Sequence, residues 1–358
     1  MAEHKLLITG NEAIAEAAIQ AGCRFYAGYP ITPQNELTTY MAEHMPRAGG
    51  CFIQAESELA AINMVFGASA TGARSMTSSS SPGISLKQEG ISYLAGAELP
   101  AVIVNVMRGG PGLGNIAPAQ SDYFQATRGG GHGDYHCIVL APWTVQECYN
   151  LMFRAFDLAD KYRTPVIILS DGMLGQMMEP VRINPKLKAG VKVYPKPWAL
   201  TGCKNREPNV AKSFYLKEGD LEKFNISLQK KYREISQKEQ RYETVGLKDA
   251  KMVLVAYGTM ARIARAALES PRLKDKKIGL IRPISLWPFP KQVFELLARK
   301  RKKPQILTIE MSCGQMLDDV KLAAEGRFKV DFLGRSGGGI PSEEEIVRKI
   351  SAIFKNHD

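Results

Sequence analysis

Short apolar runs alternate with longer helical patterns from residue 10 to residue 171. Continuous apolar runs are typical of strands covered on both faces, and the helices between them supply the crossovers that parallel strands need. The pattern therefore predicts a parallel α/β sheet. The expected strands are residues 24–27, 51–54, 101–106 and 165–170, and the expected helices are residues 12–19, 57–71 and 144–162. We expect Asn11 to cap the first helix and Gly22 to end it.

The alternation pauses in the middle of the chain. This stretch begins with prolines and lysines, as a linker does, and then carries apolar residues at helical spacing in a charged background. We interpret it as a surface helix that lies on a neighbouring domain, with a partner-binding helix as the alternative. The residues with helical spacing are Leu221, Phe224, Leu228, Tyr232, Ile235 and Tyr242.

From Lys251 onward the alternation resumes, with expected strands at residues 252–257, 278–281 and 305–309. This part predicts a second, smaller α/β domain. The predicted division is therefore a first domain of residues 1–180, a linker and charged helix of residues 181–245, and a second domain of residues 246–358.

Charge and cysteine content narrow the classes of function. The net charge is +11, with the excess beyond residue 180, and the densest run, residues 299–303, is interpreted as a solvated helix end. An acidic protein partner is the alternative. Nucleic-acid binding is not expected, because no recognised module or interleaved aromatic residues are present. The six cysteines form no Cys-x-x-Cys pair, which argues against an iron–sulfur cluster or zinc site held by this chain.

Two further sequence features bear on location. No apolar run is long enough to span a bilayer. The N-terminal residues do not have the pattern of a secretory signal. We therefore expect a cytoplasmic protein.

Candidate functional groups follow the predicted strands, and ligands of parallel sheets bind beyond the carboxyl ends of strands. Tyr29-Pro30-Ile31-Thr32-Pro33 follows the first strand, and its prolines restrict the backbone around the Thr32 hydroxyl. An ordinary turn is the alternative. Glu56 and Glu58 open the next helix, where Ser57 is a candidate cap. Either carboxylate could meet a ligand nitrogen or simply stabilise the helix start.

Three more loops carry polar groups. Arg108 ends the strand at residues 101–106 and precedes a glycine-rich loop, a position that suits two-pronged binding of a carboxylate, with a surface ion pair as the alternative. Ser78-Ser79-Ser80-Ser81-Pro82-Gly83 could hold an anion or an amide-bearing ligand, or only cap a helix. His132-Gly133-Asp134-Tyr135-His136 alternates potential metal ligands, but its glycines favour a flexible loop and we assign no metal.

Together these motifs resemble those of the 2-oxoacid:ferredoxin oxidoreductases, in the subunit with a pyrimidine-binding domain and a transketolase C-terminal-like domain. The resemblance covers nearly the whole chain. Residues 311–316 look most like the branched-chain 3-methyl-2-oxobutanoate group, and the 2-oxoglutarate group stays open. The matching segments are residues 10–13, 28–33, 56–58, 78–83, 108–111 and 129–134.

The resemblance implies roles for individual residues. Glu58 would contact N1′ of the thiamine aminopyrimidine and so promote removal of the C2 proton; Glu56 is the less suitable candidate. Thr32 and Arg108 would bind the carboxylate and carbonyl oxygens of the substrate. The residues expected at the thiamine diphosphate site are Glu58, Tyr29, Pro30, Ser80 and Ser81.

The resemblance also implies partners. Asp171-Gly172 is similar to part of a diphosphate–magnesium motif but lacks the preceding glycine and the downstream asparagines, so we interpret it as a turn. A beta-type subunit would then supply the diphosphate- and Mg²⁺-binding domain. A gamma subunit and a ferredoxin-like subunit with [4Fe–4S] clusters would complete the enzyme. The implied reaction is oxidative decarboxylation of a 2-oxoacid, with coenzyme A accepting the acyl group and ferredoxin the electrons.

Two rival hypotheses remain. The pyrimidine-binding half of a non-oxidative thiamine enzyme would need neither coenzyme A nor an iron–sulfur partner. A noncatalytic assembly or regulatory subunit would tolerate Glu58→Gln without loss of turnover.

Overall fold

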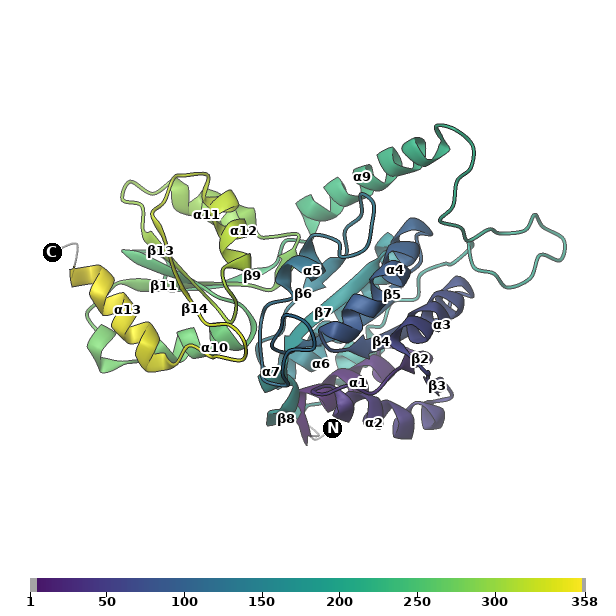
Figure 1. The fold of residues 1–358 in the computed structure, drawn as a ribbon, viewed down its shortest axis with the longest axis horizontal. Coiled ribbons are helices and arrows are strands. Elements are labelled where there is room, and N and C mark those ends of the chain that lie inside the picture. Colours follow the sequence, from purple (N-terminus) through teal and green to yellow (C-terminus); the bar gives the residue numbers. More distant parts are fainter. Residues whose placement is uncertain (1–4, 356–358) are drawn as a thin grey trace.

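The computed structural model describes residues 5–355 and contains two large sheets, each flanked by helices (Figure 1). The first sheet has seven strands in the order β12-β6-β7-β5-β4-β2-β3, of which all but β12 are parallel. The predicted parallel α/β fold is therefore confirmed. The strands are β2 (Phe25–Gly28), β3 (Cys51–Gln54), β4 (Ser75–Ser79), β5 (Ala101–Met107), β6 (Ile138–Leu140), β7 (Pro165–Asp171) and β12 (Ser285–Trp287).

Helices cover this first sheet. α3 packs against α4 and against β2 and β4, whereas α6 packs against α1 and β7. A separate antiparallel pair, β1 (Lys5–Thr9) with β8 (Met178–Arg182), lies beside them. The helices of this part are α1 (Gly10–Gln20), α2 (Asn35–His44), α3 (Glu58–Ala70), α4 (Pro82–Gly96), α5 (Tyr123–Thr127), α6 (Val145–Tyr162), α7 (Gly172–Gln176) and α8 (Pro185–Ala189), with a 3₁₀ turn at Pro46–Ala48.

The start of α1 corrects one prediction. The cap is Thr9, whose side chain accepts from the Glu12 amide while the Glu12 carboxylate accepts from the Thr9 amide. This reciprocal pair is the capping box. Asn11 is instead buried inside the helix and donates to the Pro33 carbonyl at 2.8 Å and to Glu36 at 2.7 Å. Its side chain therefore fixes the turn that follows β2.

The second sheet has five strands in the order β14-β13-β10-β11-β9, with β9 antiparallel at the edge. It confirms the second α/β unit. Its strands are β9 (Tyr242–Val245), β10 (Met252–Val255), β11 (Ile278–Pro283), β13 (Gln305–Glu310) and β14 (Val330–Gly334), and its helices are α10 (Gly258–Ala267), α11 (Lys291–Ala298), α12 (Gln315–Ala324) and α13 (Glu343–Lys355), with a 3₁₀ turn at Pro271–Leu273. The basic run at residues 299–303, exposed except for the partly buried Lys300, follows the end of α11.

The two sheets are joined by more than the linker. β12, from the second half of the chain, pairs with β6 of the first sheet. The Gln120 side chain donates to the Tyr257 carbonyl at 2.9 Å and accepts from the Met311 amide at 3.0 Å. Asp171, expected in a turn, caps α7 and accepts from the Thr259 hydroxyl at 2.9 Å. The division at residues 180 and 245 stays a prediction.

The helix of the middle stretch is α9 (Asp220–Lys238), which runs along the first sheet's side of the molecule (Figure 1). Its buried face consists of Leu228, Tyr232 and Ile235. Tyr242 does not continue this face, because the helix ends before Glu239 and Tyr242 begins β9. The apolar spacing therefore predicted the helix but placed its end too late.

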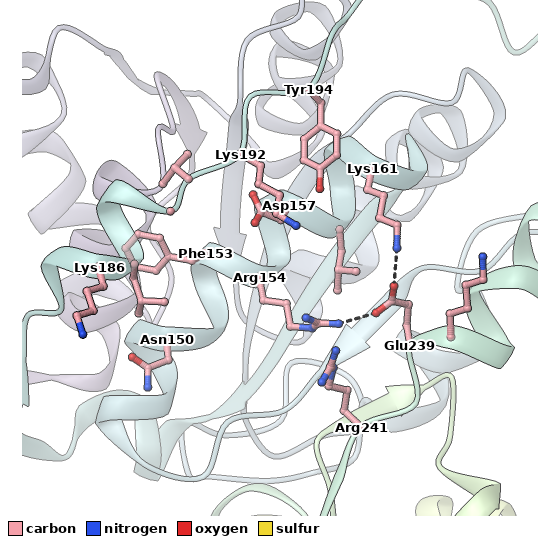
Figure 2. A pocket seen from close by; sticks show the side chains of 15 residues that line it. Asn150, Phe153, Arg154, Asp157, Lys161, Lys186, Lys192, Tyr194, Glu239 and Arg241 are labelled. Atoms are coloured by element: carbon pink, nitrogen blue, oxygen red, sulfur yellow. Dashed lines mark hydrogen bonds and ion pairs between the residues drawn. The ribbon is translucent and has the colours of Figure 1, made fainter.

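Glu239, just after α9, ties that helix to α6 (Figure 2). Its carboxylate accepts from Arg154 at 2.5 Å, Lys161 at 3.0 Å and the Tyr162 hydroxyl at 2.8 Å, and the residue is 5% exposed. We expect Glu239→Gln to lower the free energy of unfolding by about 1–3 kcal/mol, because the amide weakens three charge-assisted hydrogen bonds. Urea unfolding of the purified chain measures the change.

The matched control for this prediction is Glu234→Gln. Glu234 pairs with Lys238 one turn away on exposed α9 surface. Solvent screens such a pair, so its loss should leave the unfolding midpoint unchanged. An unchanged midpoint for Glu239→Gln would show that the buried carboxylate contributes nothing.

None of the helices in residues 5–355 is long and apolar enough to cross a membrane. The six cysteines are free thiols; Cys23, Cys137 and Cys148 are buried, whereas Cys51, Cys203 and Cys313 are exposed. The three buried cysteines are core residues.

Candidate functional site

The predicted motifs meet at one edge of the first sheet. β5, β4, β2 and β3 are neighbours and parallel, so their carboxyl ends lie side by side. The loops after these four strands carry the Thr32 turn, the start of α3, the serine loop and Arg108. Ligands bind at such an edge.

Arg108 connects two of these loops. Its guanidinium donates from Nη1 to the Thr32 carbonyl at 2.9 Å and from Nη2 to the Leu113 carbonyl at 3.1 Å. Nε is buried and has no partner among the described residues. The side chain is thus not a surface ion pair, since Arg108 is 6% exposed. The Thr32 hydroxyl is partly exposed and accepts from Asn35 at 3.4 Å.

Ser81 holds the serine loop to the end of β5. Its hydroxyl accepts from the Arg108 amide at 3.0 Å and donates to Asp122 at 2.6 Å. Its φ of 29° lies in a region that residues other than glycine rarely adopt, and such outliers cluster at functional sites. Burial raises the pKa of the Asp122 carboxyl, although hydrogen bonds from Ser81 and Asn105 oppose the shift.

Glu58 opens α3 and turns into the protein. Ser57 caps the helix by accepting from the Ala60 amide at 3.1 Å, as expected. Glu58 is then 6% exposed, whereas Glu56, two residues earlier, is exposed. A Cβ on Gly83 would lie 2.6 Å from Glu58 Oε1 and 2.1 Å from Ser79 Oγ. Glycine at position 83 is therefore what lets the serine loop approach the Glu58 carboxylate.

Two hydroxyls of the serine loop lack partners. Ser79 and Ser80 are fully buried, and neither Oγ has a hydrogen-bond partner in the part of the chain that the structure describes. Buried polar groups are normally satisfied, so orphans call for an explanation such as a ligand. A buried carboxylate, two free hydroxyls and a close glycine suit the nitrogens of an aminopyrimidine. Tyr29 and Pro30 lie further out, on exposed surface of the Thr32 turn.

Sequence reasoning missed Lys87, Tyr26 and Asp122 at this edge. Lys87, on α4, is fully buried and donates to the Ser78 carbonyl at 3.1 Å and to the Thr77 hydroxyl. Tyr26 lies beneath the loop, and its hydroxyl is 2.6 Å from Ser78 Oγ. Lys87 is followed by Gln88 and Glu89 in α4, so its local sequence resembles an exposed polar face, and neither Lys87 nor Asp122 carried a signal of its place at this edge.

The His132–His136 loop does not bring its potential ligands together with others in the described part of the chain. No group of three or more potential ligands that could hold a metal occurs among residues 5–355. His136 stacks on Trp287, with 4.5 Å between ring centroids, and burial lowers its pKa.

A cavity of about 500 Å³ lies near Glu239 and is lined by residues of α6, α8 and the end of α9 (Figure 2), away from the motif residues.

Comparison with known proteins places this geometry in a family. The family model described as "Pyruvate flavodoxin/ferredoxin oxidoreductase, thiamine diP-bdg" matches residues 16–241, and "Pyruvate:ferredoxin oxidoreductase core domain II" matches residues 250–346. The chain therefore belongs to the 2-oxoacid:ferredoxin oxidoreductase family. It is a subunit of an oxidoreductase and carries that family's thiamine-diphosphate-binding domain.

Individual relatives support this family assignment. The chain is 50% identical to the ketoisovalerate oxidoreductase subunit VorB of Methanothermobacter marburgensis, over 97% of each chain. It is 36% identical to the 2-oxoglutarate synthase subunit KorA of Methanothermobacter thermautotrophicus, over 96% of this chain and 97% of the relative. A solved 2-oxoglutarate:ferredoxin oxidoreductase from Magnetococcus marinus superposes with a TM-score of 0.85 at 28% identity, covering 98% of this chain and 65% of that one.

Proposed function

We propose that this chain is the pyrimidine-binding subunit of an enzyme that oxidatively decarboxylates 3-methyl-2-oxobutanoate (ketoisovalerate) to an acyl-coenzyme A. The observation that carries the reaction class is the buried Glu58 carboxylate, which lies close to Gly83 together with the unpartnered Ser79 hydroxyl. The 50% identity to a ketoisovalerate oxidoreductase subunit supports the branched-chain substrate over 2-oxoglutarate, whose relative is 36% identical.

The residues at the sheet edge divide the task. Thiamine diphosphate, when bound, supplies the acidic carbon at which a 2-oxoacid is decarboxylated. Glu58 accepts and returns a proton at N1′ of the aminopyrimidine, a task suited to a carboxylate held away from water. Thr32 and Arg108 bind the oxygens of the 2-oxoacid. Ser80 and Ser81 shape the loop against which the pyrimidine packs.

Partner subunits complete the proposed enzyme. Asp171, the residue most similar to a diphosphate–magnesium motif, is engaged in capping α7 and in binding Thr259. We therefore infer that a beta-type subunit holds the diphosphate and Mg²⁺. A gamma subunit and a ferredoxin-like subunit with [4Fe–4S] clusters would pass electrons to ferredoxin.

A panel of 2-oxoacids tests the substrate. We expect the purified native complex to reduce a viologen dye with 3-methyl-2-oxobutanoate, and only when coenzyme A is present. Its kcat/KM with 2-oxoglutarate should be at least about tenfold lower, since differential binding of unlike side chains in a pocket contributes roughly 1–3 kcal/mol. Preference for 2-oxoglutarate would assign the chain to the other branch. Decarboxylation without coenzyme A or dye reduction would indicate a non-oxidative thiamine enzyme.

A further inference from the structure

The cavity of about 500 Å³ near Glu239 has a strongly basic lining (Figure 2). Six cationic side chains line it, against two carboxylates, those of Asp157 and Glu239. Apolar side chains, among them Phe153 and Leu158, form another part of the wall. Its volume falls in the range of roughly 300–1,000 Å³ that small-molecule sites occupy. The cations are Arg154, Lys161, Lys186, Lys192, Lys238 and Arg241.

Both carboxylates of the lining are already engaged. Asp157 accepts from Arg74 at 3.0 Å, and Arg74 is not part of the lining. Glu239 accepts from Arg154 and from Lys161. Neither carboxylate is therefore free to balance the other cations of the cavity.

Several donors of the lining lack acceptors. Lys186, Lys192 and Arg241 are exposed, and their side chains make no hydrogen bond or ion pair within residues 5–355. Arg154 Nε is buried and likewise has no partner there. Burial and the positive charge of Arg241 lower the pKa of Arg154. An anion bound among these groups would satisfy the free donors and relieve the repulsion between like charges.

The cavity lies at the edge of the first sheet opposite the predicted motifs. Asp157 belongs to the second half of α6, the helix that leads into the amino end of β7. Its partner Arg74 directly precedes β4 and so marks the amino ends of the strands. Thr32, Glu58 and Arg108 instead follow the carboxyl ends of their strands. A ligand in this cavity is therefore separate from the 2-oxoacid and the aminopyrimidine.

We propose that this cavity binds a phosphorylated small molecule of about the size of a nucleotide. Phosphate oxygens are suitable acceptors for the free cations, and the guanidinium groups of Arg154 and Arg241 offer planar donors that match phosphate geometry. Inorganic phosphate alone would leave most of the volume unfilled. The apolar wall at Phe153 and Leu158 suits the uncharged part of a larger ligand.

Isothermal titration calorimetry of ADP, inorganic pyrophosphate and adenosine against the purified full chain tests the proposal. We expect ADP to bind, with an affinity that falls as the salt concentration rises, because salt screens exposed charges. Pyrophosphate lacks the apolar part and should bind more weakly, and adenosine lacks the phosphates and should show no binding. An ADP affinity no higher than that of either fragment would overturn the proposal.

Matched variants locate the binding. Arg241→Gln and Lys192→Gln should each weaken ADP binding about tenfold, because each removes one charge-assisted contact. Arg301→Gln and Lys302→Gln remove the same charges from the exposed basic run after α11 and should keep the wild-type affinity. Equal weakening in all four variants would reduce the binding to general attraction by a basic protein and overturn the proposal.

The same titration on the native complex separates a small ligand from a protein partner. We expect the complex to bind ADP with the affinity of the full chain and to show the same loss in Arg241→Gln. Binding by the full chain that disappears in the complex would mean that a partner subunit covers the cavity. That result would overturn the proposal in favour of an acidic protein segment as the occupant.

Discussion

Replacing Glu58 with glutamine is expected to slow exchange of the C2 proton of thiamine diphosphate by at least about 10²-fold in the assembled enzyme, the range in which a positioned acid–base group contributes. Glutamine keeps the size of the side chain but cannot take up and return a proton at N1′. The residue is buried, and its Oε1 and the Ser79 hydroxyl both lie close to Gly83. Overall turnover should fall by a similar factor.

Glu56→Gln provides the control, because Glu56 precedes the same helix but is exposed. This variant should retain wild-type exchange. Size-exclusion chromatography of both variants should show intact complexes, since the amide preserves the packing around Gly83. Wild-type exchange in Glu58→Gln together with a loss in Glu56→Gln would reverse the two assignments. Wild-type turnover in both would favour the noncatalytic subunit.

Much of the sheet edge follows from local sequence. Apolar runs at 51–54 and 101–106 are long enough to specify buried strands, and the loops that follow them then meet by the geometry of parallel sheets. Ser57 predicts the start of α3, because a serine before an acidic residue and an alanine-rich run is a typical helix cap. Which of the two carboxylates, Glu56 or Glu58, faces the interior could be decided only from the structure, because only the structure shows how deeply each is buried.

Other features depend on contacts between distant residues. Asn11 has the sequence position of a helix cap, but Thr9 caps the helix because Glu12 completes a capping box with it. The Asn11 side chain instead donates a hydrogen bond to the Pro33 carbonyl in the turn after β2. Tyr242 has helical spacing but joins β11 through β9. β12 pairs across to β6, a long-range match that no local pattern specifies. Tertiary pairing overrides local preference in each case.

The residues of the site also divide into those that local sequence indicates and those that only the folded structure brings together. The residues predicted for chemistry carry recognisable motifs, whereas the residues that support them do not. Lys87 would ordinarily be assigned to the surface, because lysine is almost never fully buried. Asp122 comes from a loop beyond Arg108 and reaches Ser81 only after folding. The contacts that such residues make with the serine loop depend on three-dimensional packing rather than on spacing along the chain.

Arg108→Lys is expected to lower kcat/KM for the 2-oxoacid roughly ten- to a hundredfold, the equivalent of about 1.5–3 kcal/mol for a charge-assisted hydrogen bond. The guanidinium already uses Nη1 and Nη2 to join the Thr32 turn to the loop at Leu113. Lysine keeps the charge but cannot bridge two carbonyls while still presenting a donor to a carboxylate. Most of the loss should appear as a higher KM, with thiamine diphosphate affinity little changed.

Steady-state kinetics on the assembled variant with several 2-oxoacids measures this loss, and Arg128→Lys is its control. Arg128 makes a two-pronged ion pair with Asp319 between the two sheets, where the same substitution removes the same geometry away from the sheet edge. That variant should lose stability and keep its kcat/KM. Because carboxylate recognition is common to all 2-oxoacids, Arg108→Lys should weaken each of them by a similar factor. A loss confined to one substrate would mean that Arg108 recognises the side chain, and unchanged kcat/KM for all would remove it from the substrate site.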